Sequence, residues 1–243
     1  MLLPPLSPAI RDLVIVPSGR LNVIPFETLL TDDAENITEY TLMPYVINRF
    51  NIRYEFSAGL LLQRDTQPAM AARSSIFLCA PVSFPDRPYL GQLPGTETEV
   101  AEISKLFAEK NLPSMVYTHL QAEENLIKSA RLKDFGLVHF ATHGIVDEAR
   151  PELSRIFLQS GSQNDGDLFA GEIYNLELNA SLVTLSACQT GLGKVMKGEG
   201  VIGLSRALVY AGAKNIVVSF WNVADESTAL LMKDFYYNLL ADP

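Results

Sequence analysis

The segment LVTLSACQTG, residues 182–191, indicates the fold class of this chain. It begins with a short run that is almost entirely apolar and ends in small and polar residues that include Cys188 and Gly191. A continuous run of this kind is typical of a strand buried on both faces, as in a parallel sheet covered by helices. The same pattern recurs at residues 76–80, 137–141 and 216–221, so the sequence predicts several such strands.

Helical segments lie between these strands. Apolar residues recur at helical spacing in residues 96–107, 123–132, 201–211 and 225–240. Thr96 and Glu99 have the spacing of a capping box at the first helix. Gly212 is placed to end the third helix, and Asp225 to cap the fourth. With shorter strands at 114–118 and 156–158, the alternation predicts an α/β fold with a mostly parallel sheet and helices on both faces, in three layers.

The first part of the chain follows a different pattern. Apolar residues at 13–16 and 21–25 flank a Pro-Ser-Gly-Arg stretch at 17–20, which predicts an N-terminal β-hairpin. Residues 67–75 indicate a linker. We therefore expect an N-terminal hairpin and linker region, residues 1–75, followed by an α/β core, residues 76–243.

The composition excludes several classes of protein. The 243 residues include 28 acidic and 19 basic side chains, for a net charge of −9, so a general nucleic-acid surface is not expected. No apolar run approaches the roughly 18 residues of a membrane span, and the N-terminus lacks the features of a signal peptide. Two cysteines in apolar surroundings, Cys79 and Cys188, favour a reducing compartment, so we expect a cytoplasmic protein.

The few cysteines and histidines also bear on cofactors. With two Cys and three His in all, a zinc site made only of these residues would need nearly every one of them. We therefore expect no metal, and the cysteine-peptidase chemistry considered below needs no organic cofactor.

Three chemically active residues follow three of the predicted strands. His143 follows the strand 137–141, Cys188 follows Leu185, and Asp225 follows the strand 216–221. Because loops at the carboxyl ends of parallel strands meet at one edge of a sheet, we expect these residues to lie together. A thiolate that attacks a carbonyl, a histidine that moves protons and backbone N–H groups that bind an oxyanion are the parts of a cysteine peptidase.

Several stretches resemble a known family, the CHAT domain, a caspase-like module that is often attached to tetratricopeptide repeats. They are VPSGRL (16–21), IPFETL (24–29), THG (142–144), LSACQTG (185–191), GEGV (198–201) and FWNVAD (220–225). The separation of His143 and Cys188, 188 − 143 = 45 positions, is also close to the spacing of about 50 in caspases. The resemblance covers nearly the whole chain.

The resemblance implies a caspase-like fold and a cysteine endopeptidase of the caspase–separase type. The family's dyad carries over to Cys188 as nucleophile and His143 as general acid and base, with the backbone N–H groups of Gly144 and Cys188 as oxyanion donors. Asp225 matches the separase carboxylate that binds a basic residue before the scissile bond, and by charge Asp147 could do the same. Ser186 stands where caspases have a pocket glutamine, so a preference for aspartate is not expected.

The resemblance also implies how the chain is completed and controlled. Members usually continue past the last helix into a strand with a Trp-Ala pair, so we expect a domain truncated at its C-terminus, which as an isolated chain could lack activity. A protein substrate is expected, with activity gated by an attached domain or partner of the tetratricopeptide type. No membrane or nucleic-acid partner is expected. The sequence names neither the substrate, the activating signal nor the oligomeric state.

Two other functions remain open. The first is a non-catalytic CHAT pseudoprotease that serves as an interaction module. The second is a nucleotide-binding enzyme, which only the glycines of residues 188–203 suggest. A P-loop in residues 188–195 would need Gly where Cys188 stands and Ser or Thr where Val195 stands, so the motif is not matched. The pattern Gly198-x-Gly200-x-x-Gly203 opens a helix, but the strand before it ends too early for a dinucleotide turn.

The remaining cysteine and histidines have plainer interpretations. Cys79 lies within the apolar strand 76–80 and is expected to be inert core. His139 alternates with apolar neighbours and is expected to be a packed histidine with its hydrogen bonds satisfied. His119 follows a short strand, and we expect it at the surface.

Overall fold

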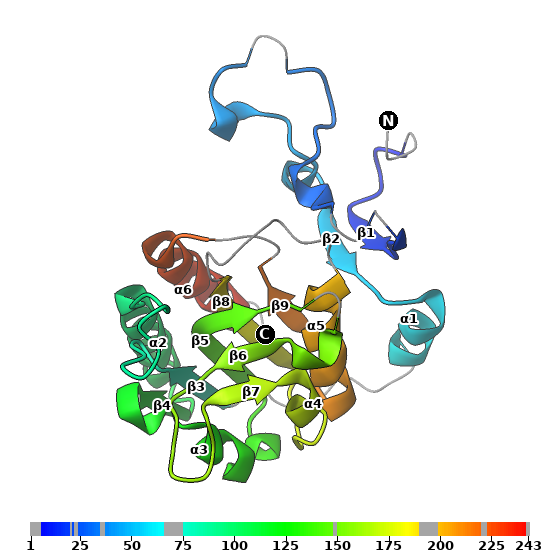
Figure 1. The fold of residues 1–243 in the computed structure, drawn as a ribbon. Helices are drawn as coiled ribbons and strands as arrows, with labels where there is room; N and C mark the ends of the chain where they lie inside the picture. Colours follow the sequence, from blue (N-terminus) through cyan, green and yellow to red (C-terminus); the bar gives the residue numbers. More distant parts are fainter. Residues whose placement is uncertain are drawn as a thin grey trace. The chain divides into compact units, whose positions relative to one another are not determined.

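A computed structural model describes residues 6–19, 21, 24–34, 37–65, 75–147, 150–189, 199–219 and 223–241. For residues 60, 63–65, 187–189 and 199–202 it describes the backbone alone. The chain divides into two compact units, residues 1–69 and 70–243, which are described separately below (Figure 1).

The N-terminal unit contains a small parallel sheet, and its described residues do not form the predicted hairpin, whose second arm lies partly outside the described residues at 22 and 23. Strand β1 (Asp12–Ile15) pairs in parallel with β2 (Asn51–Tyr54), and the helix α1 (Ala58–Asp65) follows. Short 3₁₀ turns lie between the strands at Phe26–Thr28, Tyr40–Leu42 and Val46–Asn48. The apolar run after the turn at 17–20 suited a hairpin locally, but β1 takes its partner from a segment more distant in sequence.

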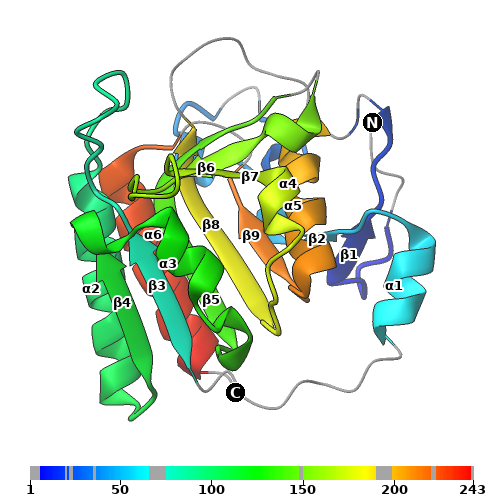
Figure 2. The same cartoon turned by 60° about the horizontal axis from the view of Figure 1, so that its bottom comes forward.

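The second unit is built on a seven-stranded sheet, shown in Figure 2. Five strands are parallel and lie in the spatial order β4-β3-β5-β8-β9: β3 (Ile76–Ala80), β4 (Ser114–Thr118), β5 (Leu137–Ile145), β8 (Leu182–Gln189) and β9 (Ile216–Val218). Strands β6 (Arg155–Phe157) and β7 (Asp167–Phe169) continue from the end of β5 as antiparallel partners.

Helices cover both faces of this sheet. Helices α2 (Pro94–Glu109) and α6 (Asp225–Ala241) pack on one face, where Ile103 and Met232 meet Leu78 in one apolar cluster. Helices α3 (Glu124–Ser129), α4 (Ala170–Ile173) and α5 (Glu199–Ala211) cover the other face. Alternate strand residues point to opposite faces, so each strand supplies both clusters. The predicted three-layer α/β fold is confirmed.

A buried polar cluster joins both helices of the first face to the sheet. His139 on β5 is fully buried; its Nε2 lies 2.9 Å from Oε1 of Glu99 on α2, and its Nδ1 lies 3.3 Å from the Tyr236 hydroxyl on α6. That hydroxyl is also 2.9 Å from Thr184 Oγ1 on β8, and burial raises its pKa. The expectation of a packed His139 is confirmed, but its Nε2 contacts Glu99 only as an ion-pair neighbour and forms no hydrogen bond, so the expectation that its hydrogen bonds are satisfied holds only for Nδ1.

The predicted capping box at α2 is wrong, because Glu99 belongs to this buried polar cluster. The helix begins at Pro94, so Thr96 lies inside its first turn and its hydroxyl donates to the Leu93 carbonyl at 2.7 Å. Glu99 is 1% exposed and faces His139 instead of turning back to the helix start.

The central strands extend further than their apolar runs. Strand β5 continues through His143 to Ile145, and β8 continues through Cys188 to Gln189, because each keeps a paired neighbour beyond its apolar residues. The sequence predicts no strand or helix at β7 and α4, and α3 ends at Ser129, short of the predicted 132.

Helix α5 ends at Ala211 as predicted, and its terminal glycine offers a test of the fold. Gly212 has φ +115, and a Cβ there would lie 2.1 Å from the Leu178 carbonyl oxygen. Gly212→Ala should therefore lower the free energy of unfolding by about 2 kcal/mol or more, measured by urea denaturation. The matched Gly171→Ala change meets only one atom, at 4.0 Å, and should leave the stability unchanged or slightly higher. Equal effects of the two substitutions would contradict this account.

Candidate active site

The pairing of β5 with β8 brings His143 and Cys188 to neighbouring positions. The two strands run in parallel register from Leu137 opposite Leu182 to Gly144 opposite Gln189, and in this register His143 lies opposite Cys188. Neighbouring strands are about 4.8 Å apart, and positions that face each other across a pair belong to the same face of the sheet. The two residues predicted as base and nucleophile are therefore adjacent at the level of the backbone.

The strand order of the sheet reverses on the other side of β5. Numbered along the chain, the five parallel strands lie in the order second, first, third, fourth, fifth, so the reversal falls between β3 and β5. Loops that leave two such strands diverge, and the crevice between them is the usual ligand site of an open α/β sheet. Here the loop 82–93 follows β3, and His143 lies near the end of β5.

The imidazole of His143 is held by this loop. His143 is 7% exposed, and its Nε2 lies 2.8 Å from the carbonyl oxygen of Gly91. The ring of Phe84 packs against it, with centroids 5.4 Å apart. Because a carbonyl oxygen can only accept, Nε2 carries the hydrogen, and in the neutral ring Nδ1 is then the nitrogen that can accept a proton.

Gly91 is a functional candidate that the sequence analysis missed. The prolines and glycine at 82–94 indicated a loop, but a backbone carbonyl that orients a histidine has no side-chain signature. The signal that the sequence did offer was the presence of large apolar residues in this loop. In the structure Phe84, Leu90 and Leu93 pack with Phe157 in a separate apolar cluster. This cluster seats the loop beside the end of β5.

The predicted oxyanion donor Gly144 lies within the sheet. It faces Gln189 on β8 and Ile156 on β6, so it is paired on both sides. Two positions before Cys188, Ser186 is 6% exposed, and its hydroxyl has no hydrogen-bond partner. It lies opposite Ala141, on the same face of the sheet as His143.

Asp225 lies at the first residue of α6 and contacts the start of another helix. Its Oδ2 accepts a hydrogen bond from the Gly95 N–H at 2.6 Å, within the first turn of α2. A Cβ on Gly95 would lie 2.7 Å from this carboxylate. Asp225 therefore caps α2 from a distant part of the chain, at Gly95, which lies four residues after Gly91. Val223, two residues before Asp225, packs against the loop cluster.

Asp147 takes part in a local turn beyond β5. Its carboxylate accepts the Arg150 N–H at 2.9 Å and lies 3.7 Å from the Arg150 guanidinium, and its own N–H donates to Ser154 Oγ at 3.0 Å. The structure does not pair it with His143 or Asp225.

The other cysteine lies deep in the sheet. Cys79 on β3 has no exposed surface, and burial raises the pKa of its thiol well above the usual range. A thiol in this state is almost entirely protonated at neutral pH, which makes it a poor nucleophile. It provides an internal control for Cys188.

The glycine-rich segment is only partly described. Residues 190–198, including the P-loop-like stretch, lie outside the described residues. Strand β8 ends at Gln189 and α5 begins at Glu199, so the tight strand–turn–helix of a dinucleotide site is not formed. Gly203 allows α5 to approach Pro151, whose Cβ would be 3.1 Å from a Cβ at this glycine.

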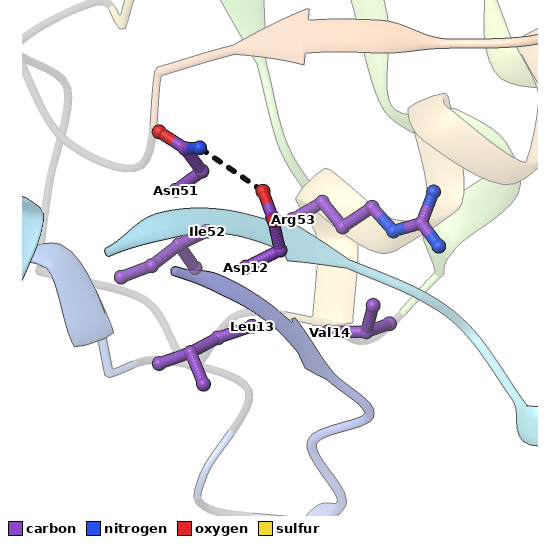
Figure 3. Close-up of a pocket in the computed structure, with 6 residues that line it drawn as sticks. All are labelled: Asp12, Leu13, Val14, Asn51, Ile52 and Arg53. Carbon is purple, nitrogen blue, oxygen red and sulfur yellow. Dashed lines mark hydrogen bonds between the residues drawn. The ribbon is translucent and has the colours of Figure 1, made fainter. Parts of the chain in front are cut away.

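A hollow in the N-terminal unit offers no comparable chemistry. It is lined by residues of β1 and β2, namely Asp12, Leu13, Val14, Asn51, Ile52 and Arg53 (Figure 3). The Asn51 amide donates to Asp12 Oδ1 at 3.0 Å, which links the two strands. Among the residues that the structure describes, no three His, Cys, Asp or Glu side chains gather so as to hold a metal ion, and no helix could cross a membrane.

The fold and the site together define a class of protein. It is a three-layer α/β protein whose parallel sheet carries a histidine and a cysteine at paired positions near the carboxyl ends of two central strands. A family model described as the CHAT domain matches residues 1–243, and the chain belongs to this family.

Known proteins resemble the chain over most of its length. Tetratricopeptide repeat protein 28 of Homo sapiens is 26% identical over 277 residues, which cover 95% of this chain and 10% of that protein. The Mus musculus protein of the same name is 26% identical over 276 residues, covering 95% and 11%. The chain thus spans about a tenth of the length of these relatives. A Streptococcus pneumonia TIGR4 flavodoxin is 14% identical, with a TM-score of 0.39 over 70% of this chain and 99% of its own, and this likeness carries no argument.

The cap made by Asp225 gives a test of its structural role. Asp225→Ala removes the acceptor of the Gly95 N–H and should lower the free energy of unfolding by about 1 kcal/mol. Glu226→Ala removes an equivalent charge from the same helix turn without touching α2, and should have a smaller effect. Urea denaturation of both variants measures the difference. If Asp225→Ala does not lower the stability, the carboxylate does not stabilise the start of α2, and the capping role is contradicted.

Proposed function

We propose that this chain is a cysteine endopeptidase of the caspase–separase type that acts on a protein substrate. The observation that carries the proposal is the register of β5 and β8, which sets His143 opposite Cys188 at the carboxyl edge of the sheet. Membership of the CHAT family supports a caspase-like module, and the hydrogen bond from His143 to Gly91 supports a histidine oriented for proton transfer.

The proposed reaction has two stages. Nδ1 of His143 takes the proton of the Cys188 thiol, and the sulfur attacks the scissile carbonyl carbon to form a tetrahedral oxyanion. Backbone N–H groups of Gly144 and Cys188 are the proposed donors to this oxyanion, and Gly144 would first have to separate from one of its strand partners, Ile156 or Gln189. The C–N bond breaks as the imidazolium gives its proton to the leaving amine. Water, deprotonated by His143, then hydrolyses the thioester and restores the thiol.

A basic residue before the scissile bond is the proposed specificity. Asp225 reaches the start of α2, beside the loop that holds His143, and Val223 packs on the same loop. One hydrogen bond leaves an ionised carboxylate with further acceptor capacity, so capping α2 and binding a guanidinium or ammonium are compatible. Asp147 is the second candidate carboxylate and would first have to release Arg150.

Control by an attached domain or partner belongs to the same proposal. The two curated relatives named above are tetratricopeptide repeat proteins, which supports a setting of protein–protein contacts. The same fact supports the second candidate function, a CHAT module that binds partners without cleaving them. Both functions use the same fold, so reactivity of the thiol decides between them.

The deciding experiment is covalent labelling of the native chain. A peptide chloromethyl ketone with a terminal lysine or arginine should modify Cys188 but not Cys79, because burial keeps the Cys79 thiol protonated and inaccessible. Mass spectrometry of tryptic peptides identifies the labelled residue. Cys79→Ala should label like the wild type, whereas Cys188→Ala should not label.

Two further variants sharpen the result. His143→Ala should slow labelling by about 100-fold or more, because it removes the group that ionises the thiol. Asp225→Asn should slow the basic ketone more than a neutral one, if the carboxylate binds the basic side chain. A native Cys188 that resists every such reagent, in the presence of the attached repeat domain as well, supports the interaction module. Stabilisation by nucleotide in a thermal melt would instead favour the nucleotide-binding alternative.

A further inference from the structure

Among the side chains of the loop 82–93, that of Arg87 makes the largest set of bonds to the rest of the fold. The loop has no helix or strand, and it closes on itself through Leu93 N–H to Val82 O at 2.8 Å and Leu90 N–H to Arg87 O at 2.9 Å. Gly91, whose carbonyl holds His143, lies immediately after that second bond. The position of Gly91 therefore depends on where Arg87 is held.

Arg87 is held by the hairpin of β6 and β7. Its Nη1 donates to the Leu158 carbonyl at 2.9 Å, and its Nη2 donates to the Asp165 carbonyl. Nη2 also lies 2.8 Å from Oδ1 of Asp167, and the guanidinium carbon lies 5.4 Å from the centroid of the Phe157 ring. The side chain is only 12% exposed. Two carbonyls and a carboxylate are thus bound by a single planar fork, which lysine cannot reproduce.

The surroundings of the guanidinium leave it little freedom. Gly166 has φ +82, and a Cβ there would lie 2.8 Å from Nη2 of Arg87 and 2.6 Å from the Leu158 carbonyl oxygen. Burial raises the pKa of Asp167, against the lowering effect of Arg87 and Arg155, so the carboxylate depends on these cations to stay charged. Arg155 lies 2.9 Å from the other oxygen of Asp167.

The hairpin is itself attached next to His143. The hydroxyl of Thr142, the preceding residue on β5, donates to the Phe157 carbonyl at 2.5 Å, and Gly144 pairs with Ile156. Two residues that follow β6 also bond the loop: Gln159 donates to the Ser83 carbonyl at 2.5 Å, and Ser160 donates to the Asp86 carboxylate at 2.8 Å. A closed path of contacts therefore runs from β5 through the hairpin and the loop back to the imidazole.

We propose that Arg87 is a positioning residue for His143: by tying the loop to the β6–β7 hairpin, it fixes the Gly91 carbonyl that keeps the hydrogen on Nε2 and Nδ1 available as the base. The effect on catalysis rests on the function proposed above, whereas the effect on the histidine ring does not. Arg87 touches neither His143 nor the proposed substrate directly, so it acts only through the loop.

The test reads the tautomer of His143 by long-range ¹H–¹⁵N correlation spectroscopy. The chain has three histidines, and a His143→Gln variant assigns the signal. In the wild type the neutral ring should be the Nε2–H form. Arg87→Gln should convert it to a mixture of the two forms, and Arg87→Lys, which keeps only the ion pair with Asp167, should give an intermediate ratio.

The matched control is Arg155→Gln. It removes a cation from the same carboxylate, while Arg87 keeps its bonds to the Leu158 and Asp165 carbonyls. The control should lower thermal stability but leave the tautomer unchanged. An unchanged tautomer in folded Arg87→Gln, or an equal change in Arg155→Gln, would overturn the proposal. If Arg87→Gln does not fold, as judged by circular dichroism, the ratio in Arg87→Lys decides.

Alkylation of Cys188 by iodoacetamide separates this proposal from the proposed function. If both hold, Arg87→Gln should slow alkylation by about 10- to 100-fold, because a small displacement of the base is enough. A wild-type Cys188 that does not react, in the presence of the attached repeat domain as well, contradicts the peptidase, yet the tautomer still decides the role of Arg87. Slower alkylation without a change in tautomer would overturn the positioning role.

Discussion

The parallel pairing of β5 with β8 is the constraint on which the rest of the structure depends. It is the longest ladder at the centre of the sheet, and it extends beyond the apolar runs of both strands to the polar residues at their ends. Because register in a buried sheet is set by which side chains face each core, a shift of one residue in β8 would turn all of its side chains to the opposite face. The same pairing that buries Val138 and Val183 therefore sets His143 opposite Cys188.

Around this ladder, loop and helix ends are joined by bonds between distant segments. Asp225 at the start of α6 caps the start of α2, the loop before α2 holds His143, and Arg87 in that loop is bound by the β6–β7 hairpin. Each bond satisfies a backbone group that its own segment leaves unpaired, as buried polar groups require. A change in one of these segments is thus transmitted to the imidazole through few, identifiable contacts.

The sequence predicted the strands and helices of the core well where the signal was local. Continuous apolar runs located β3, β5 and β8, and Gly212 marked the end of α5. Prediction from the sequence failed where the partner of a segment lies elsewhere in the chain. The N-terminal hairpin gave way to a parallel pair with residues 51–54, and Glu99, expected to cap its own helix, faces His139. The cap that α2 has instead comes from Asp225, far along the chain.

What the sequence by itself determined was the class of fold and the residues with reactive chemistry. Apolar periodicity reports burial, and few side chains other than cysteine and histidine offer a nucleophile and a base at neutral pH. Only the tertiary structure decided how these groups are held. The acceptor for His143 is a backbone carbonyl of Gly91, and the anchors of its loop are the carbonyls of Leu158 and Asp165. Every residue has such a carbonyl, so its role follows from its place in space and leaves no trace in the amino-acid sequence.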